Sequence, residues 1–186
     1  MGKSLLQRSV FLIIAAFLLL IAAAWRPEVY GNDEPSIRRY IRETTGFWMQ
    51  GRGELLAVED RNDDRIVIFR PDSTKPDELW FVRFRKNADG NYEGYAPENP
   101  RTMYEGRCGD GIWSDSVNGY GDDRTTYYFV WSENPDLGEI VFRLKHGDEQ
   151  RIQITENPSL TIFEFDTYGS WGCSAFFYDA EGNEIR

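Results

Sequence analysis

The chain of 186 residues carries 31 acidic and 21 basic side chains, a net charge of −10 at pH 7. Nucleic acids and anionic lipid surfaces are bound through clustered cations, so this balance argues against both as partners. Aromatic residues make up 15% of the chain, which is too many for a disordered protein, and we expect a folded one with a self-repelling surface.

An unbroken apolar run, VFLIIAAFLLLIAAAW, occupies residues 10–25. Lys3 and Arg8 precede it, and the first acidic residue of the chain is Glu28. A basic N-terminus before an apolar run is typical of a segment that enters a membrane and leaves its N-terminus in the cytoplasm. We therefore expect the rest of the chain to be exported across the plasma membrane.

The fate of residues 1–25 stays open in the sequence. A helix of this apolar length spans about 24 Å, short of the roughly 30 Å hydrocarbon core, which favours a cleaved signal peptide. Ala22 and Ala24 also form a small-residue cleavage site before Trp25. Trp25 and Arg26 equally suit the outer interface of a retained helix. Residues 1–25 are predicted to be a signal peptide or a membrane anchor, and the exported part to be secreted or anchored facing outward.

One amphipathic helix is predicted next, within NDEPSIRRYIRETTG (32–46). The segment begins with residue types that cap helices and ends at Gly46. Ile37, Tyr40 and Ile41 share one face at helical spacing. This face should pack against the body of the protein.

Beyond the helix the apolar period changes from 3.6 to 2, which indicates β-strands. Turns rich in Asn, Asp and Gly separate the strands, as in antiparallel hairpins, so we expect an antiparallel sandwich or a barrel-like meander. The predicted strands are ELLAVED (54–60), RIVIFR (65–70), ELWFVRFRK (78–86), NYEGYA (91–96), TTYYFVWS (125–132), GEIVFRLK (138–145), QRIQIT (150–155), LTIFEFD (160–166) and SAFFYD (174–179).

Alternation within these strands predicts one buried and one hydrated face. In 138–145, Val141, Arg143 and Lys145 occupy the face expected to be hydrated. The side chains expected in the core of the two clearest strands are Trp80, Val82, Phe84, Ile140, Phe142 and Leu144.

Cys108 and Cys173 are the two cysteines of the chain. In an oxidising exterior a pair without a competing thiol most simply forms a disulfide. Their spacing of 65 residues would stabilise the fold by about 4 kcal/mol in the loop-closure treatment. A zinc site or a thiol nucleophile needs further ligands or a base, and His146 is the single histidine. We therefore expect no metal and no cofactor.

The C-terminal half carries a resemblance. TTYYFVWSENPDLGEIVFRLKHGDEQRIQI (125–154), PSLTIFEF (158–165) and AFFYDAEGNEI (175–185) resemble the closing region of uncharacterised secreted or membrane-anchored proteins of Bacillus-like Gram-positive bacteria. There a tryptophan shortly before Asn-Pro precedes a hairpin, and the chain closes on Y-D-x-x-G-N-x-I. The stretch 65–94 is similar to a charged hairpin of the same group. The resemblance implies an immunoglobulin-like β-sandwich without assigned catalytic residues.

The predicted fold is mainly β, an antiparallel meander and immunoglobulin-like sandwich preceded by a short amphipathic helix and the N-terminal apolar helix. Its expected parts are the signal peptide or anchor (1–25), a linker (26–33), the helix plus antiparallel meander (34–104), a Gly/Asp-rich loop (105–124) and the immunoglobulin-like portion (125–186).

Acidic stretches raise two chemical alternatives. DRNDD (60–64), NADGNYE (87–93) and GYGDDR (119–124) contain several oxygen ligands each, as calcium loops do. Hairpin turns explain the same residues, so calcium binding is left open. Paired carboxylates could also serve an exported hydrolase, but the sequence alone does not bring two of them together.

The loop over residues 106–128 combines aromatic with small polar residues, a composition used in contact surfaces. Trp113 and Tyr120 are the side chains most suited to partner binding there, and a packed or disulfide-stapled loop is the alternative. We expect a non-catalytic binding or structural module of the cell envelope that meets a protein or glycan at the cell surface. The competing hypotheses are a carboxylate-dependent hydrolase and an inhibitor or immunity-type protein acting through this loop.

Overall fold

The structure is a computed structural model that describes residues 29–45, 53–95, 100–105, 111–118, 123–145, 147–166 and 173–185. Within these ranges the protein is mainly β with antiparallel sheets, as the sequence predicts. No helix in these ranges is long and apolar enough to cross a membrane. The apolar segment 10–25 lies outside them.

The single helix of the described ranges, α2, spans Glu34–Thr45 and confirms the predicted helix. Asp33 caps its N-terminus, because the Asp33 carboxylate accepts a hydrogen bond of 2.8 Å from the Ser36 backbone N–H. The hydroxyl of Ser36 in turn accepts one from the Asp33 backbone N–H. Ile37 and Ile41 are fully buried on the inner face of the helix.

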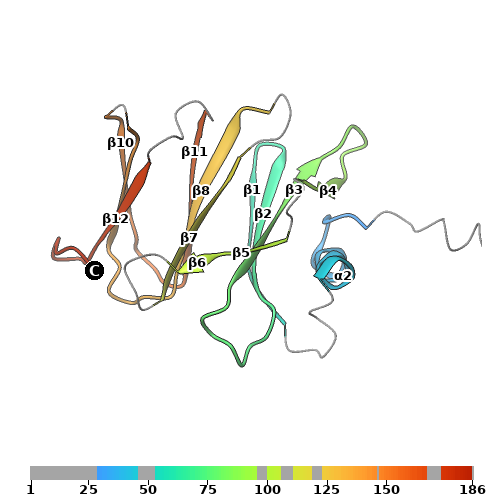
Figure 1. Cartoon of the computed structure of the whole chain (residues 1–186), viewed down its shortest axis with the longest axis horizontal. Coiled ribbons are helices and arrows are strands. Elements are labelled where there is room, and N and C mark those ends of the chain that lie inside the picture. The colour runs from blue at the N-terminus through green and yellow to red at the C-terminus, as the bar shows by residue number, and fades with distance from the viewer. Residues whose placement is uncertain are drawn as a thin grey trace, which may run out of the picture.

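Twelve strands within the described ranges form three antiparallel sheets, which we call A, B and C (Figure 1). Sheet A has the order β1-β2-β3-β4, with β5 also paired to β3; sheet B has the order β11-β8-β7-β6, and sheet C the order β10-β9-β12. The strands are β1 (Glu54–Arg61), β2 (Asp64–Arg70), β3 (Trp80–Lys86), β4 (Tyr92–Gly94), β5 (Arg101–Thr102), β6 (Tyr104–Glu105), β7 (Ile112–Asn118), β8 (Thr125–Ser132), β9 (Glu139–Arg143), β10 (Glu149–Gln153), β11 (Ser159–Asp166) and β12 (Ser174–Tyr178).

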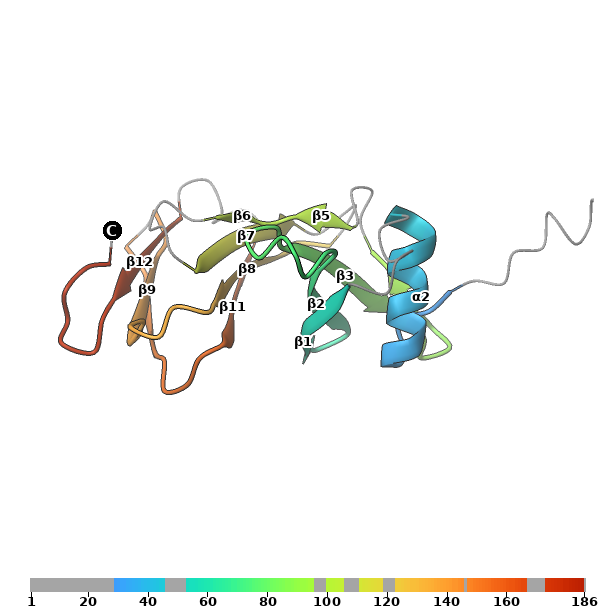
Figure 2. The same ribbon diagram turned by 90° about the horizontal axis from the view of Figure 1, so that it is seen from below.

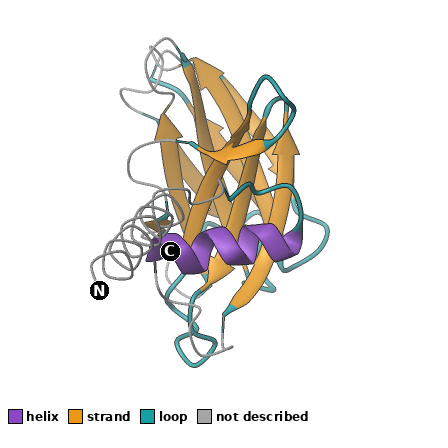
Figure 3. Cartoon of the chain, turned by 90° about the vertical axis from the view of Figure 1, so that its right-hand side faces the viewer, coloured by secondary structure: helices purple, strands orange, loops and turns teal. Residues whose placement is uncertain are grey.

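The elements stack in four layers, in the order α2, sheet A, sheet B, sheet C (Figures 1 and 2). Seen end on, α2 lies across the strands of sheet A (Figure 3). Three apolar clusters fill the spaces between successive layers. Sheets A and B are therefore covered on both faces, and sheet C leaves one face to solvent.

The prediction of one hydrated face is wrong for β3. Val82 and Phe84 are buried against α2, as expected, but Phe81 and Arg83 on the opposite face are also buried, against sheet B. The reason is tertiary: a second sheet covers the face that an isolated sandwich layer would expose to water. Val141, expected on the hydrated face of β9, is buried between its neighbours Arg151 and Phe176 on the adjoining strands.

Strand β7 lies inside the range predicted to be a loop (105–124). Its sequence, IWSDSVN, mixes apolar residues with Asp and Asn, which are depleted in strands. Pairing with β8 along the whole of β7 supplies the backbone hydrogen bonds that local preference does not favour. The predicted core of β9 is confirmed for Ile140 and Phe142, which pack between sheets B and C.

Candidate functional site

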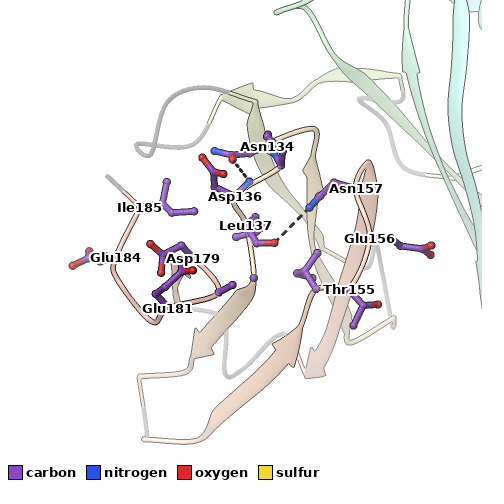
Figure 4. A pocket seen from close by; sticks show the side chains of 14 residues that line it. Asn134, Asp136, Leu137, Thr155, Glu156, Asn157, Asp179, Glu181, Glu184 and Ile185 are labelled. Atoms are coloured by element: carbon purple, nitrogen blue, oxygen red, sulfur yellow. Dashed lines mark hydrogen bonds between the residues drawn. The ribbon is translucent and has the colours of Figure 1, made fainter.

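A pocket of about 800 Å³ opens at the end of the stack formed by sheet C (Figure 4). Ligand sites typically measure about 300–1,000 Å³, so this one has the size of a small ligand or a short peptide segment. Three stretches line it, 134–138, 154–157 and 179–185. We call it the acidic pocket, because the described residues of its lining include five carboxylates and no Lys, Arg or His.

The stretch 134–138 connects β8 to β9, and its own side chains hold it in a tight turn. The Asn134 side-chain oxygen accepts a hydrogen bond of 2.8 Å from the Asp136 backbone N–H, an Asx turn. The Ser132 hydroxyl accepts one from the Asn134 backbone N–H. Leu137 is 2% exposed and packs into the cluster between sheets B and C. The turn thus places the acidic Asp136 at the surface, next to a leucine that is buried in the core.

The stretch 179–185 forms the opposite wall and follows β12. The Asp179 carboxylate accepts hydrogen bonds from the Asn183 backbone N–H at 2.7 Å and from the Asn183 side-chain amide at 2.9 Å. These bonds lower the pKa of Asp179 below its ordinary value, so the carboxylate stays charged. Gly182 takes a left-handed φ of 85°, which glycine adopts without strain.

Close backbone approach joins the walls at Gly138. Its N–H donates to the Tyr178 carbonyl, and its own carbonyl accepts from the Ile154 N–H, both at 2.8 Å. A Cβ at this position would lie 2.8 Å from the backbone nitrogen of Ala180. Glycine therefore lets the 134–138 turn approach the 179–185 stretch without a steric clash, and this approach shapes the pocket.

Part of the charge of the acidic pocket has no neutralising cation among the described residues. Asp136, Glu156 and Glu181 have no basic partner in the part of the chain that the structure describes. Figure 4 shows Asp136 and Asp179 between the 134–138 turn and the 179–185 stretch, whereas Glu156 and Glu184 point outward. On the outer face of sheet C, by contrast, arginines pair with the carboxylates beside them.

A second polar cluster lies between sheets A and B. Arg83 is 0% exposed, and its guanidinium donates to both oxygens of Asp64 at 3.1 and 2.8 Å. Arg85 also donates to both Asp64 oxygens, at 2.9 and 2.8 Å. Asp123 lies 3.0 Å from Arg83 and 2.8 Å from Arg85, and the Tyr127 hydroxyl donates to Asp64 at 3.0 Å. We call these five residues the buried ion network.

The network keeps its carboxylates charged inside the protein. Burial by itself raises the pKa of Asp64, but hydrogen bonds from Arg85 and Arg83 outweigh it and hold the pKa below its ordinary value. For Asp123, the backbone N–H of Thr125 and the two arginines likewise outweigh burial, and its pKa is lowered. The two arginines of this cluster are matched by its two carboxylates, so the cluster stabilises the packing of sheet A against sheet B.

Asp115 on β7 is a separate buried carboxylate. Its Oδ1 lies 2.7 Å from Arg101, whereas its buried Oδ2 has no hydrogen-bond partner among the described residues. Burial raises the pKa of Asp115, against the opposing effects of the Ser116 N–H and Arg101. Asp115 lies two residues from both Trp113 and Val117 and therefore shares their face of β7, which is turned toward sheet A.

The residues singled out in the sequence fall in different places. Trp113 lies in the core between sheets A and B, 3% exposed, and its indole N–H donates to the Asp77 carbonyl at 3.3 Å. This is a packing position, the alternative that the sequence left open. Tyr120 and Cys108 lie outside the described residues. Cys173 is partly buried against the cluster between sheets B and C. The described ranges contain no disulfide, and the Cys108–Cys173 bond stays a prediction.

The acidic loops proposed for calcium form hairpin turns where they are described. In 87–93, the Asn87 side-chain oxygen accepts from the backbone N–H groups of Asp89 and Asn91. No group of three or more potential metal ligands comes together within the described ranges. Part of 119–124 and His146 lie outside them.

Sequence reasoning did not find the acidic pocket. Its lining comes from turns up to 51 residues apart in the chain, each of which looks like an ordinary connection. The sequence does indicate two of its turns, at Asn134-Pro-Asp136 and between Asp179 and Asn183. Neither turn indicates which other segments of the chain lie next to it. Comparisons of the chain with protein families, with curated proteins and with solved structures gave no match.

Proposed function

We propose that the protein is an exported, non-catalytic binding module of the cell envelope and that the acidic pocket is its binding site. One observation carries this proposal: a concave site of about 800 Å³ whose described lining carries charges of one sign and has an apolar part, Ile154 and Ile185, which we call its floor. Stability alone does not require such a lining, since clustered like charges repel one another. The apolar segment 10–25 behind Lys3 and Arg8 supports export.

The position of the pocket suits recognition away from a membrane. Helix α2 begins nine residues after Trp25, a length of chain that spans at most roughly 30 Å. The acidic pocket lies at the other end of the stack (Figures 1 and 4), and packed layers are roughly 10 Å apart. With the N-terminal segment held in the bilayer, the α2 end would face the membrane and the pocket would face the envelope space.

We further propose that β7 to β12 form an immunoglobulin-like unit. Strand β8 pairs with β7 and β11 in one sheet, while β9 pairs with β10 and β12 in the sheet packed against it. Consecutive strands β8 and β9 thus belong to opposite sheets, and the chain returns to each sheet later. The sandwich of immunoglobulin domains has this crossing pattern, and its loops cluster at the ends, where binding sites lie.

A carboxylate-dependent hydrolase has less support. A general acid needs a raised pKa, whereas the pKa of Asp179 in the acidic pocket is lowered. Asp115 has a raised pKa, but it faces the interior between sheets A and B and is paired with Arg101. Its side chain is 9% exposed, so a substrate would have little access to it.

Site-specific photocrosslinking tests the binding function without assuming the nature of the ligand. A photoreactive amino acid replaces Glu181 at the pocket rim in the full chain, expressed in cells with an intact envelope. The control carries it at Asp89, in the turn between β3 and β4. We expect a discrete product of higher mass from position 181 and none from position 89. Equal products from both positions, or none from position 181, would contradict the proposal.

A further inference from the structure

We infer that the acidic pocket binds an alkylammonium or guanidinium group on an apolar stem, presented as a Lys or Arg side chain of a partner's peptide segment. This inference rests on the proposed binding function and specifies its ligand. It draws on the shape, the floor and the charge of the pocket together.

The charge of the lining selects for a cation. Five carboxylates and no basic side chain are found among the described lining residues, and Asp136 and Glu181 have no salt-bridge partner in the described part of the chain. The chain as a whole is also strongly acidic, at −10, so its long-range field draws cations toward the surface and repels anions. A carboxylate or phosphate ligand would be repelled by the acidic side chains that remain unpaired in this site.

The floor selects for a cation with an apolar stem. Ile154 and Ile185 are partly buried in the lining and leave apolar surface open to a ligand, whereas Leu137 is nearly fully buried and offers little. Methylene groups of Lys and Arg pack on such surfaces while their charged ends stay near water and carboxylates. A bare metal ion would not use this floor, and the described ranges bring no three metal ligands together.

The volume and place of the pocket favour a peptide over a single small amine. About 800 Å³ is near the upper end of the range for ligand sites, which leaves room for more than one side chain. The pocket also lies at the end of the stack (Figures 1 and 4), where a large partner can approach. A free polyamine offers the same chemistry, so the experiment compares the two sources.

Fluorescence anisotropy of a labelled tetralysine peptide provides the test, with the full chain in a neutral detergent. Unlabelled spermine serves as competitor, and labelled tetraglutamate as the anionic control. The pocket variant is Asp136→Asn with Glu181→Gln. The matched control variant is Asp63→Asn with Asp89→Asn, exposed carboxylates in the turns of sheet A, and it changes the net charge by the same amount. All four sites are exposed, so we expect both variants to fold.

We expect the tetralysine peptide to bind the unaltered chain and tetraglutamate not to bind. The pocket variant should bind tetralysine about tenfold more weakly, since two exposed ionic contacts are lost. The control variant should bind nearly as well as the unaltered chain. Binding should weaken as salt is added, because these contacts are screened.

Three results would overturn the inference: no binding of tetralysine, equal weakening in both variants, or spermine that binds more tightly than the peptide. The last would assign the pocket to free amines. If position 181 still crosslinks to a partner while cationic peptides fail to bind, the ligand class is wrong and the binding function stands. If position 181 gives no crosslink, the function itself fails.

Discussion

Replacement of Arg83 by methionine tests how much the buried ion network contributes to the stability of the fold. Arg83→Met keeps a long apolar side chain in the space between sheets A and B but removes the cation. Asp64, 2% exposed, then retains Arg85 and the Tyr127 hydroxyl and loses the partner that is buried with it. Removal of one member of a buried ion pair costs about 3–5 kcal/mol, because the other charge remains in a poorly solvating site.

That cost is a large part of the total stability of a domain, which is about 5–15 kcal/mol. With a urea dependence of about 2 kcal/mol per molar, the unfolding midpoint should fall by roughly 2 M. Urea unfolding followed by circular dichroism at pH 7 measures it. Arg61→Met is the control: Arg61 pairs with Glu59 at the surface, both more than 40% exposed, and its loss should cost less than about 1 kcal/mol.

The effect should also depend on pH with a defined sign. The folded-state pKa values of Asp64 and Asp123 are lowered, so their stabilisation is present above the unfolded pKa of about 4 and is lost as the pH falls below it. Arg83→Met raises the folded-state pKa of Asp64, so the deficit of the variant should be largest at neutral pH and shrink in acid. A deficit under about 1 kcal/mol at neutral pH, or one that is constant down to about pH 3, would refute this reasoning.

Three further outcomes are expected. Trp113→Ala should lower the free energy of unfolding by about 3–5 kcal/mol, as for a core aromatic, measured by urea unfolding; an unchanged stability would contradict the packing role of Trp113. Gly138→Ala should cost about 1–3 kcal/mol, because the new Cβ would lie 2.8 Å from the backbone nitrogen of Ala180; thermal unfolding measures it, and a melting temperature equal to that of the unaltered protein would show that the contact relaxes freely. If Cys108 and Cys173 are bonded, the intact mass of the mature protein should be two hydrogens below that of its free-thiol form, and reduction should lower its stability by about 4 kcal/mol. A mass equal to that of the fully reduced chain would exclude the bond. The same measurement shows whether residues 1–24 are present.

Local physical chemistry determined the helix and the strands with strong alternation. The cap at Asp33 acts over three residues, and the spacing of Ile37 and Ile41 sets the buried face of α2 within one turn. In β9 the alternation of Ile140 and Phe142 assigns the buried face in the same way. Neighbours along the chain supply these signals, so the sequence is enough to find them.

Tertiary structure decided the burial of polar residues. Arg83 looks like a hydrated strand residue, and only the packing of sheet B against sheet A encloses it. Its partners Asp64 and Asp123 are 19 and 40 residues away in sequence. The sequence predicts a loop at β7 for a related reason: the low strand preference of its Asp and Asn residues is outweighed only in the folded chain, by pairing with β8 and by cover on both faces.

The acidic pocket exists only in the folded chain and is not indicated by the sequence. Its three stretches each form a turn by local hydrogen bonds, which the sequence can specify, but their meeting depends on pairing of β9 with both β10 and β12 and on the close approach at Gly138. Alternation and capping depend on residues that are a few positions apart in the chain. A concave site forms only where segments that are far apart in the sequence pack together. The sequence by itself therefore determined the helix, the strands and the acidic character of the chain, and the packing of the sheets determined where that acidity surrounds a cavity.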